Sequence, residues 1–146
     1  MPRLLIVATV APTLRAFLLP FARHYRALGW QVEAAARDIT ALPGLGEEFD
    51  ACHELPLSRN PLDPVALLRA PAAIRSLVAR GSYDLVHVHT PVAAFLLRLA
   101  LRGRAPGARP RVVYTAHGFH FHRHGRALTN WLFRSAERLA APWCDA

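Results

Sequence analysis

Hydrophobic residues occur along this chain in two patterns: short unbroken runs, and longer segments in which they recur every three or four positions. The unbroken runs predict five buried strands, at 3–9, 31–36, within 49–57, at 84–89 and at 111–116. The helical spacing predicts helices at about 13–28, 64–80, 91–102 and 126–141. Because strands alternate with helices of this length, parallel βαβ units are predicted.

Residues with strong local preferences mark the expected helix boundaries. Thr13 is predicted to cap the first helix, and Pro20 to kink it because proline removes a backbone hydrogen bond. Asp63 and Thr90, each followed by a proline, are predicted N-caps of the next two helices. A break is expected at Pro71.

Right-handed crossovers convert this order of elements into a Rossmann-like, doubly wound α/β sheet with strand order 3-2-1-4-5. In that order the first and fourth strands flank the point where the chain reverses direction across the sheet. The loops at 10–14, 89–91 and 117–122 then converge on one crevice at the carboxyl ends of the strands. Ligands bind at such a crevice in this class of fold.

Two of the predicted strands run into histidines at this edge. His87 and His89 share one face of the sheet because they lie two residues apart. His87 is deeper, and we interpret it as a core histidine bonded to a neighbour; His89, last before the break, suits either a core or a ligand role. His117 follows the last strand, where a histidine can exchange hydrogen bonds with a sugar hydroxyl or a phosphate oxygen. Gly118 allows the backbone to approach a ligand closely.

Other polar residues are expected on the same rim. Arg15 falls in the first turn of a helix, where it either reaches an anion or is simply solvated. Arg59 and Asn60 lie between a strand end and a helix start. Ordinary turn chemistry explains Asn60, which is followed by a proline, better than it explains Arg59.

Three further histidines, His120, His122 and His124, alternate after Gly118. Alternating residues of an extended segment lie about 6.6–6.8 Å apart, so these imidazoles do not converge on one zinc ion by themselves. No acidic residue occurs among them. We therefore expect no metal, and a histidine-rich metal-binding module is the less favoured alternative.

The sequence lacks the motifs of several common binding and catalytic sites. The loop at 10–13 contains no glycine, which argues against both a dinucleotide fingerprint and a phosphate-binding P-loop. There is no Gly-x-Ser-x-Gly elbow, no pair of carboxylates at the rim and no nucleic-acid-binding motif, so nucleic acid is not an expected partner.

Composition narrows the class of protein. The 146 residues suit one domain, and 53% hydrophobic with 19% charged residues excludes disorder. The first apolar run is interpreted as a strand rather than a signal peptide, and Cys52 and Cys144 as reduced and buried thiols, which fits the cytoplasm. The net charge of +8 comes from arginine alone and favours phosphate-bearing ligands or anionic lipid surfaces as well as nucleic acid.

Four segments together resemble the N-terminal half of family-4 glycosyltransferases. They are FLLP at 17–20, RNP at 59–61, DLVHVHTP at 84–91 and TAHGFHF at 115–121. More narrowly, they resemble the branch that builds capsular, exopolysaccharide or O-antigen repeat units on a lipid carrier. The loop at 10–13 departs from many relatives, which have glycines near the donor phosphates.

This resemblance implies the GT-B fold, in which two Rossmann-like domains face each other across a cleft. It also implies retaining transfer of a sugar from a nucleotide-sugar donor to a lipid-linked glycan acceptor, with no metal or other cofactor. The N-terminal half mainly receives the acceptor, and His117 matches the histidine that lies over the donor sugar and is the expected catalytic residue. The expected substrate-binding residues are Thr13, Arg15, Arg59, Asn60, His89, Thr90, Gly118 and His120.

By the same resemblance, 1–146 is expected to be a single N-terminal domain, truncated before the domain that binds the nucleotide sugar. It would then be a fragment, or one subunit of a split transferase whose partner supplies the donor domain, and inactive alone. The alternative is a catalytically inactive, membrane-associated scaffold.

The arginine-rich surface suits a peripheral location on the inner face of the plasma membrane, where each nearby arginine contributes about 1 kcal/mol. Trp131, Phe133 and Trp143 either insert into that surface or pack inside the protein.

Overall fold

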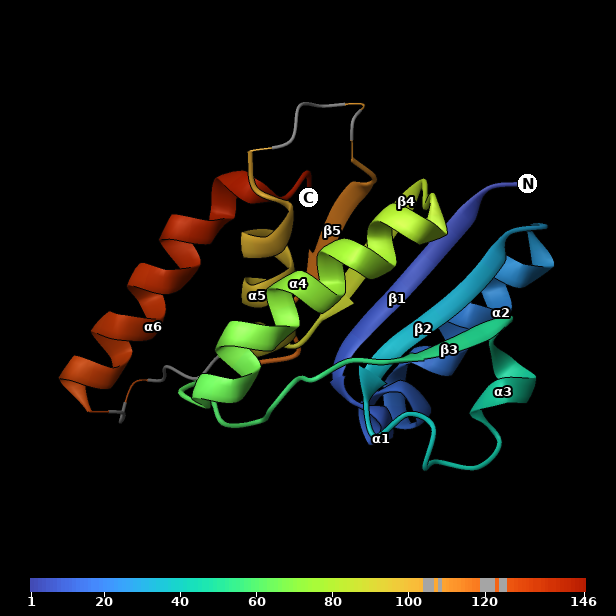
Figure 1. Cartoon of the computed structure of the whole chain (residues 1–146). Helices are drawn as coiled ribbons and strands as arrows, with labels where there is room; N and C mark the ends of the chain where they lie inside the picture. The colour runs from blue at the N-terminus through green and yellow to red at the C-terminus, as the bar shows by residue number, and fades with distance from the viewer. Residues whose placement is uncertain (104–106, 108, 119–122, 124–125) are drawn as a thin grey trace.

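The computed structural model describes residues 1–103, 107, 109–118, 123 and 126–146, and within them five parallel strands form one sheet. The order is β3-β2-β1-β4-β5 (Figure 1), which confirms the predicted doubly wound topology. The strands are β1 (Arg3–Val10), β2 (Gln31–Arg37), β3 (Ala51–Glu54), β4 (Leu85–His89) and β5 (Arg111–Thr115).

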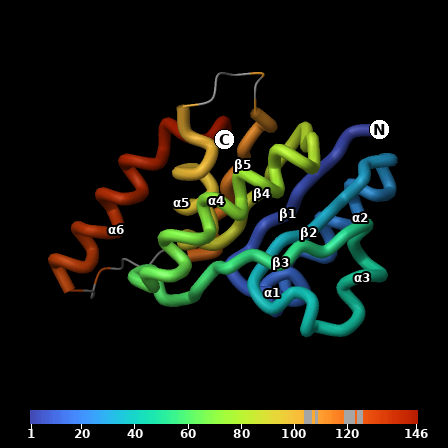
Figure 2. The backbone as a smooth tube through the Cα atoms, in the orientation of Figure 1, coloured from blue at the N-terminus to red at the C-terminus, as the bar shows by residue number. Residues whose placement is uncertain are grey.

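Helices cover both faces of the sheet. One face carries α1 (Ala11–Thr13), the π-helix η1 (Leu14–Leu18), α2 (Leu19–Ala27) and α3 (Leu45–Glu48). The other carries α4 (Pro64–Gly81) and α5 (Pro91–Leu101), with α6 (Ala127–Ala140) and the 3-10 turn η2 (Ala141–Trp143) beside α5. Figure 2 shows α6 on the far side of α5 from β1, and the C-terminal residues returning beside β5.

Each central strand contributes to two hydrophobic cores. In β1, Leu5 and Val7 pack toward α4 and α5, whereas Leu4, Ile6 and Ala8 pack toward the first helices. Because successive side chains of a strand point to opposite faces, a strand covered on both sides must be apolar at every position. This is why the strands appear in the sequence as unbroken apolar runs.

The first helical region differs from the prediction of one helix capped by Thr13 and kinked at Pro20. The helix begins at Ala11 with Val10 in the capping position, and Thr13 makes no capping hydrogen bond. The backbone then widens into the π-helix η1 just before Pro20, which lies in the first turn of α2. Since proline cannot donate to the carbonyl four residues earlier, a wider turn replaces the sharp kink.

The helix α4 begins as predicted, because the Asp63 carboxylate accepts hydrogen bonds from the backbone N–H groups of Val65 and Ala66. The predicted break at Pro71 was wrong, and α4 continues through it to Gly81. Buried residues on both sides of Pro71, including Ala70 and Ile74, hold the helix against the sheet. Their burial offsets the one hydrogen bond that proline removes.

The last residues continue the sheet beyond β5. Asp145 N–H donates to the Val112 carbonyl, and Tyr114 N–H donates to the Ala146 carbonyl, each at 2.8 Å. These two bonds are the kind that join neighbouring strands.

Candidate functional site

Three histidines gather where β4 and β5 end at the carboxyl edge of the sheet. His89 Nδ1 lies 3.0 Å from Nε2 of His117, the second residue after β5. The ring centres of His87 and His89 are 4.0 Å apart, and His87 Nε2 lies 2.9 Å from the Thr115 hydroxyl. The expected juxtaposition of His89 and His117 is present, and His87 is the satisfied core histidine that its depth indicated.

The two bonded histidines differ in their access to solvent. His89 is 0% exposed, whereas His117 is exposed at the rim. A ligand can therefore reach His117, but the His89 imidazole has no free surface with which to contact substrate. The expectation that His89 binds substrate directly does not fit this arrangement, because the first helical region covers it.

Two phenylalanines provide that cover. Phe21 of α2 packs against His87 and His89, with ring centres 5.6 and 5.8 Å apart. Phe17 of η1 lies 5.9 Å from His117 and is itself 60% exposed, so it presents an aromatic surface beside the reachable histidine. The sequence signal for this was a second apolar stripe, Phe17 and Phe21, beside the stripe of Leu14, Leu18 and Ala22 that enters the core.

The environment of His89 keeps it uncharged at neutral pH. Burial chiefly, and then the neighbouring His87 and His117, lower the pKa of His89 to about 3. Burial and His117 also lower the pKa of His87. An imidazole that loses hydration without gaining an anion favours its neutral form.

This shift predicts a loss of stability in mild acid. The unfolded chain takes up a proton at His89 near pH 6.5, whereas the folded chain does so only near pH 3, so protons favour unfolding as the pH falls between these values. From pH 7 to pH 5, His89 alone should lower the free energy of unfolding by about 2 kcal/mol, and His87 adds to the trend.

Urea unfolding at pH 7 and pH 5 measures this difference. His89→Leu should reduce it, and replacing the exposed His24 of α2 should leave it unchanged. Glu33 does not contribute in this window: burial raises its pKa, but hydrogen bonds from Tyr83, His53 and Arg3 outweigh burial and hold that pKa below its usual value. Equal stability at the two pH values would contradict the assigned environment of His89.

Thr90 joins the ends of β4 and β1 under backbone strain. Its φ of 71° is unusual for a β-branched residue. The Thr90 hydroxyl donates to the His89 carbonyl and accepts from the Thr9 N–H at 3.2 Å, and the two threonine hydroxyls are 2.6 Å apart. The expected capping bond to α5 is absent because this hydroxyl is used at the strand ends. Sequence reasoning missed Thr9, and strain of this kind often marks functional sites.

The remaining predicted residues are spread along the rim. Arg59 borders a cavity of about 420 Å³ with Arg37, Pro12 and Ser58, beyond the end of β1. The exposed Arg15 donates to the Pro43 carbonyl. The Asn60 side chain accepts from the Leu62 N–H at 3.0 Å, which is the turn chemistry that its sequence context indicated.

Two predicted residues lie elsewhere on the rim and one cannot be placed. Thr13 is half-buried at the end of α1, and Gly118 is exposed next to His117. His120 lies outside the described residues, as do His122 and His124.

In the part of the chain that the structure describes, no three histidine, cysteine or acidic side chains are grouped as a metal would require.

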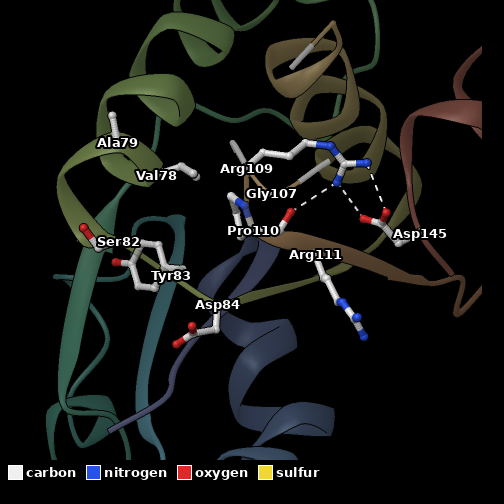
Figure 3. A pocket seen from close by; sticks show the side chains of 10 residues that line it. All are labelled: Val78, Ala79, Ser82, Tyr83, Asp84, Gly107, Arg109, Pro110, Arg111 and Asp145. Carbon is white, nitrogen blue, oxygen red and sulfur yellow. Dashed lines mark hydrogen bonds and ion pairs between the residues drawn. The ribbon is translucent and has the colours of Figure 1, made fainter. Parts of the chain in front are cut away.

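A larger cavity, of about 990 Å³, opens at the opposite, amino edge of the sheet (Figure 3). Tyr83, Asp84 and Arg111 border it, and Arg109 binds the Asp145 carboxylate there at 2.6 and 3.1 Å. Its volume exceeds that of the cavity beside Arg59, but parallel α/β sheets bind ligands at the carboxyl ends of their strands. The histidine edge is therefore the better candidate site.

The strand order and the carboxyl-edge site define a Rossmann-like domain of the kind that forms GT-B glycosyltransferases. The chain belongs to glycosyltransferase family 4, whose sequence profile matches residues 16–146. The resemblance inferred from the four sequence segments is thus confirmed.

Individual proteins show the same relationship. The chain is 39% identical over 132 residues to the "Putative glycosyltransferase EpsD" of Bacillus subtilis (strain 168), covering 89% of this chain and 32% of that protein. The chain thus spans about a third of the length of this curated relative.

Solved structures share the fold. The "putative epimerase" from Burkholderia cenocepacia J2315 has a TM-score of 0.56 at 20% identity, over 98% of this chain and 51% of its own. The glycosyltransferase SsfS6 from Streptomyces sp. SF2575, solved with thymidine diphosphate, has a TM-score of 0.56 at 15% identity, over 96% and 44%.

Proposed function

We propose that this chain is the acceptor-binding half of a retaining glycosyltransferase. The enzyme would move a sugar from a nucleotide-sugar donor to a lipid-linked glycan acceptor in polysaccharide biosynthesis. The single observation that carries the proposal is the exposed His117, held against the buried His89 at the carboxyl edge of the sheet. Family membership and the glycosyltransferase name of the relative from Bacillus subtilis support it.

The roles of individual residues follow from their positions. His117 is the proposed catalytic residue, because its imidazole can form a hydrogen bond with the reacting sugar. Phe17 offers an apolar surface to a sugar ring, and Arg59 and Arg37 supply positive charge near the acceptor diphosphate. A second domain, joined in the same chain or supplied by a partner, would bind most of the nucleotide sugar.

An apolar groove supports a lipid-linked acceptor. It has a volume of about 240 Å³ and passes between α4, α5 and α6 from Pro91, the residue after Thr90. Leu62, Leu67, Phe95 and Leu132 are among its lining residues. A lipid tail lying there would place its diphosphate and sugar near the carboxyl edge.

The outer surface of α6 suits contact with a membrane. Trp131 is 64% exposed, and Leu128 and Leu139 are exposed on the same helix. Exposed Arg126 and Arg138 flank them. Tryptophan and arginine together favour the interface of an anionic bilayer. On the strength of this exposed surface, we propose peripheral attachment to the cytoplasmic face of the membrane. No helix in the described ranges has the length and hydrophobicity to cross a bilayer.

Vesicle flotation tests this proposal. The chain should bind vesicles containing phosphatidylglycerol more strongly than vesicles of phosphatidylcholine alone, and a polyprenyl-diphosphate-linked sugar should increase binding further. Trp131→Ala should weaken binding to phosphatidylglycerol vesicles by roughly 5–30-fold, whether or not they contain the lipid-linked sugar. The reason is that burial of the tryptophan in the membrane interface would no longer contribute its free energy of about 1–2 kcal/mol. Thr129→Ala, at another exposed position of α6, is the matched control.

His117→Ala separates the enzymatic proposal from the scaffold alternative. It should leave vesicle binding unchanged and reduce only the increase caused by the lipid-linked sugar. If the lipid-linked sugar changed vesicle binding of neither the unmodified chain nor His117→Ala, the result would instead favour a membrane scaffold without an acceptor site.

A further inference from the structure

The bond between His89 and His117 has a consequence for what His117 can offer a ligand. The bond engages Nε2 of His117, the inner nitrogen of that ring. Nδ1 is then the nitrogen left to meet a ligand at the carboxyl edge. Whether Nδ1 carries a proton depends on which of the two histidines is the donor in the bond.

His89 has one ring proton to place. It is fully buried, and the titratable groups packed against it in the described part of the chain are His87 of β4 and His117. Phe21 covers it from α2. With no anion among these contacts to balance an imidazolium, the neutral ring carries its proton on either Nδ1 or Nε2.

The two positions of that proton are not equivalent. His89 Nε2 is buried without a hydrogen-bond partner in the described structure, whereas Nδ1 faces His117 at 3.0 Å. A proton on Nε2 would leave a buried N–H donor unpaired. A proton on Nδ1 leaves only an unpaired acceptor, and buried donors without partners are the rarer of the two in proteins. The proton therefore belongs on Nδ1.

We propose that His89 is a positioning residue that donates its Nδ1–H to His117 Nε2 and so holds His117 in the Nδ1–H tautomer. His117 then presents a hydrogen-bond donor at the carboxyl edge of the sheet. The atom that it meets must be an acceptor, such as a hydroxyl or phosphate oxygen of the sugar substrate. Only this last assignment rests on the proposed function, because the tautomer itself depends on the fold alone.

Nitrogen NMR of the 146-residue chain, labelled with ¹⁵N-histidine, tests the tautomer directly. At pH 8, which lies above the ordinary pKa of histidine, long-range ¹H–¹⁵N correlations distinguish protonated from unprotonated ring nitrogens. We expect a protonated Nδ1 and an unprotonated Nε2 in both His89 and His117. A protonated Nε2 in His117, or an averaged mixture of its tautomers, would overturn the proposal.

Two substitutions identify His89 as the cause. Neutral histidine in water favours the Nε2–H tautomer, so His89→Leu should return His117 to that form. His89→Asn places an amide N–H at the same number of bonds from Cβ as Nδ1 and should preserve the Nδ1–H form. Replacement of the exposed His24 assigns its signals and should leave the other tautomers unchanged.

The wild-type spectrum decides the question even where a variant fails to fold. The measurement needs neither sugar nor lipid, so it is independent of the vesicle experiment. If His117 carries its proton on Nδ1 but the lipid-linked sugar does not increase vesicle binding, the proposed function is contradicted and the role of His89 is not. If the sugar increases binding but His117 carries its proton on Nε2, only the role of His89 is contradicted.

Discussion

Replacing Glu137 with alanine is expected to lower the free energy of unfolding by about 3 kcal/mol. Glu137 of α6 receives a 2.8 Å bond from the guanidinium of Arg98 on α5, which is almost fully buried. The guanidinium also lies 4.7 Å from the ring centre of Tyr114 on β5. Without Glu137, the positive charge stays buried and loses its carboxylate.

The magnitude follows from the burial of the pair. Breaking a buried ion pair by removing one partner costs about 3–5 kcal/mol, and the lower end applies because the Glu137 side chain is 21% exposed. Urea unfolding of the variant and the parent chain at pH 7 gives the difference.

Two controls distinguish this effect from a general loss of charge. Glu48→Ala removes the partner of Arg23 in an exposed ion pair and should cost much less, because solvent screens exposed charges. The double substitution Arg98→Met with Glu137→Leu replaces both charges and should recover most of the lost stability. If Glu137→Ala cost no more than Glu48→Ala, the stabilisation assigned to the buried pair of Arg98 and Glu137 would be contradicted.

The second large effect concerns activity. In a protein that contains this chain together with a donor-binding domain, His117→Ala should reduce the rate of sugar transfer by about 10²–10³-fold. A hydrogen-bond donor aimed at the position where charge develops in the transition state contributes this much in other enzymes. The experiment compares initial rates at saturating donor and acceptor.

The structure also predicts a cost in stability for His117→Ala. Although His117 is exposed, its removal takes away the hydrogen-bond partner of the buried His89, so the free energy of unfolding should fall by about 1–3 kcal/mol, and the rates are compared where both proteins remain folded. His24→Ala, which removes an exposed histidine from α2, should leave the rate within twofold. An unchanged rate for His117→Ala would contradict the proposed catalytic role.

The strand order was predictable because the relevant information is local. Strands buried on both faces must be apolar throughout, and the lengths of the intervening helices restrict the crossovers to few arrangements. The same logic placed His89 and His117 at one edge, since the carboxyl ends of parallel strands lie together. Asp63 identified the start of α4 because a capping residue acts on its own helix.

Local preference failed where distant residues outweigh it. Pro71 lies inside a continuous helix because residues on either side of it pack against the sheet. Thr90 does not cap α5, since the end of β1 brings Thr9 within reach of its hydroxyl. Phe17 and Phe21 share an apolar stripe in the sequence, yet they cover the histidines instead of entering the core.

The sequence by itself determined the class of fold, the edge at which chemistry is expected and the family of the chain, because periodicity and short motifs are carried by neighbouring residues. Only the tertiary structure decided that His117 is exposed while His89 is buried and bonded to it. That difference depends on Phe21 of α2 lying over β4, a contact between residues far apart in the chain. Burial and hydrogen-bond partners are properties of such contacts, so no local pattern specifies them.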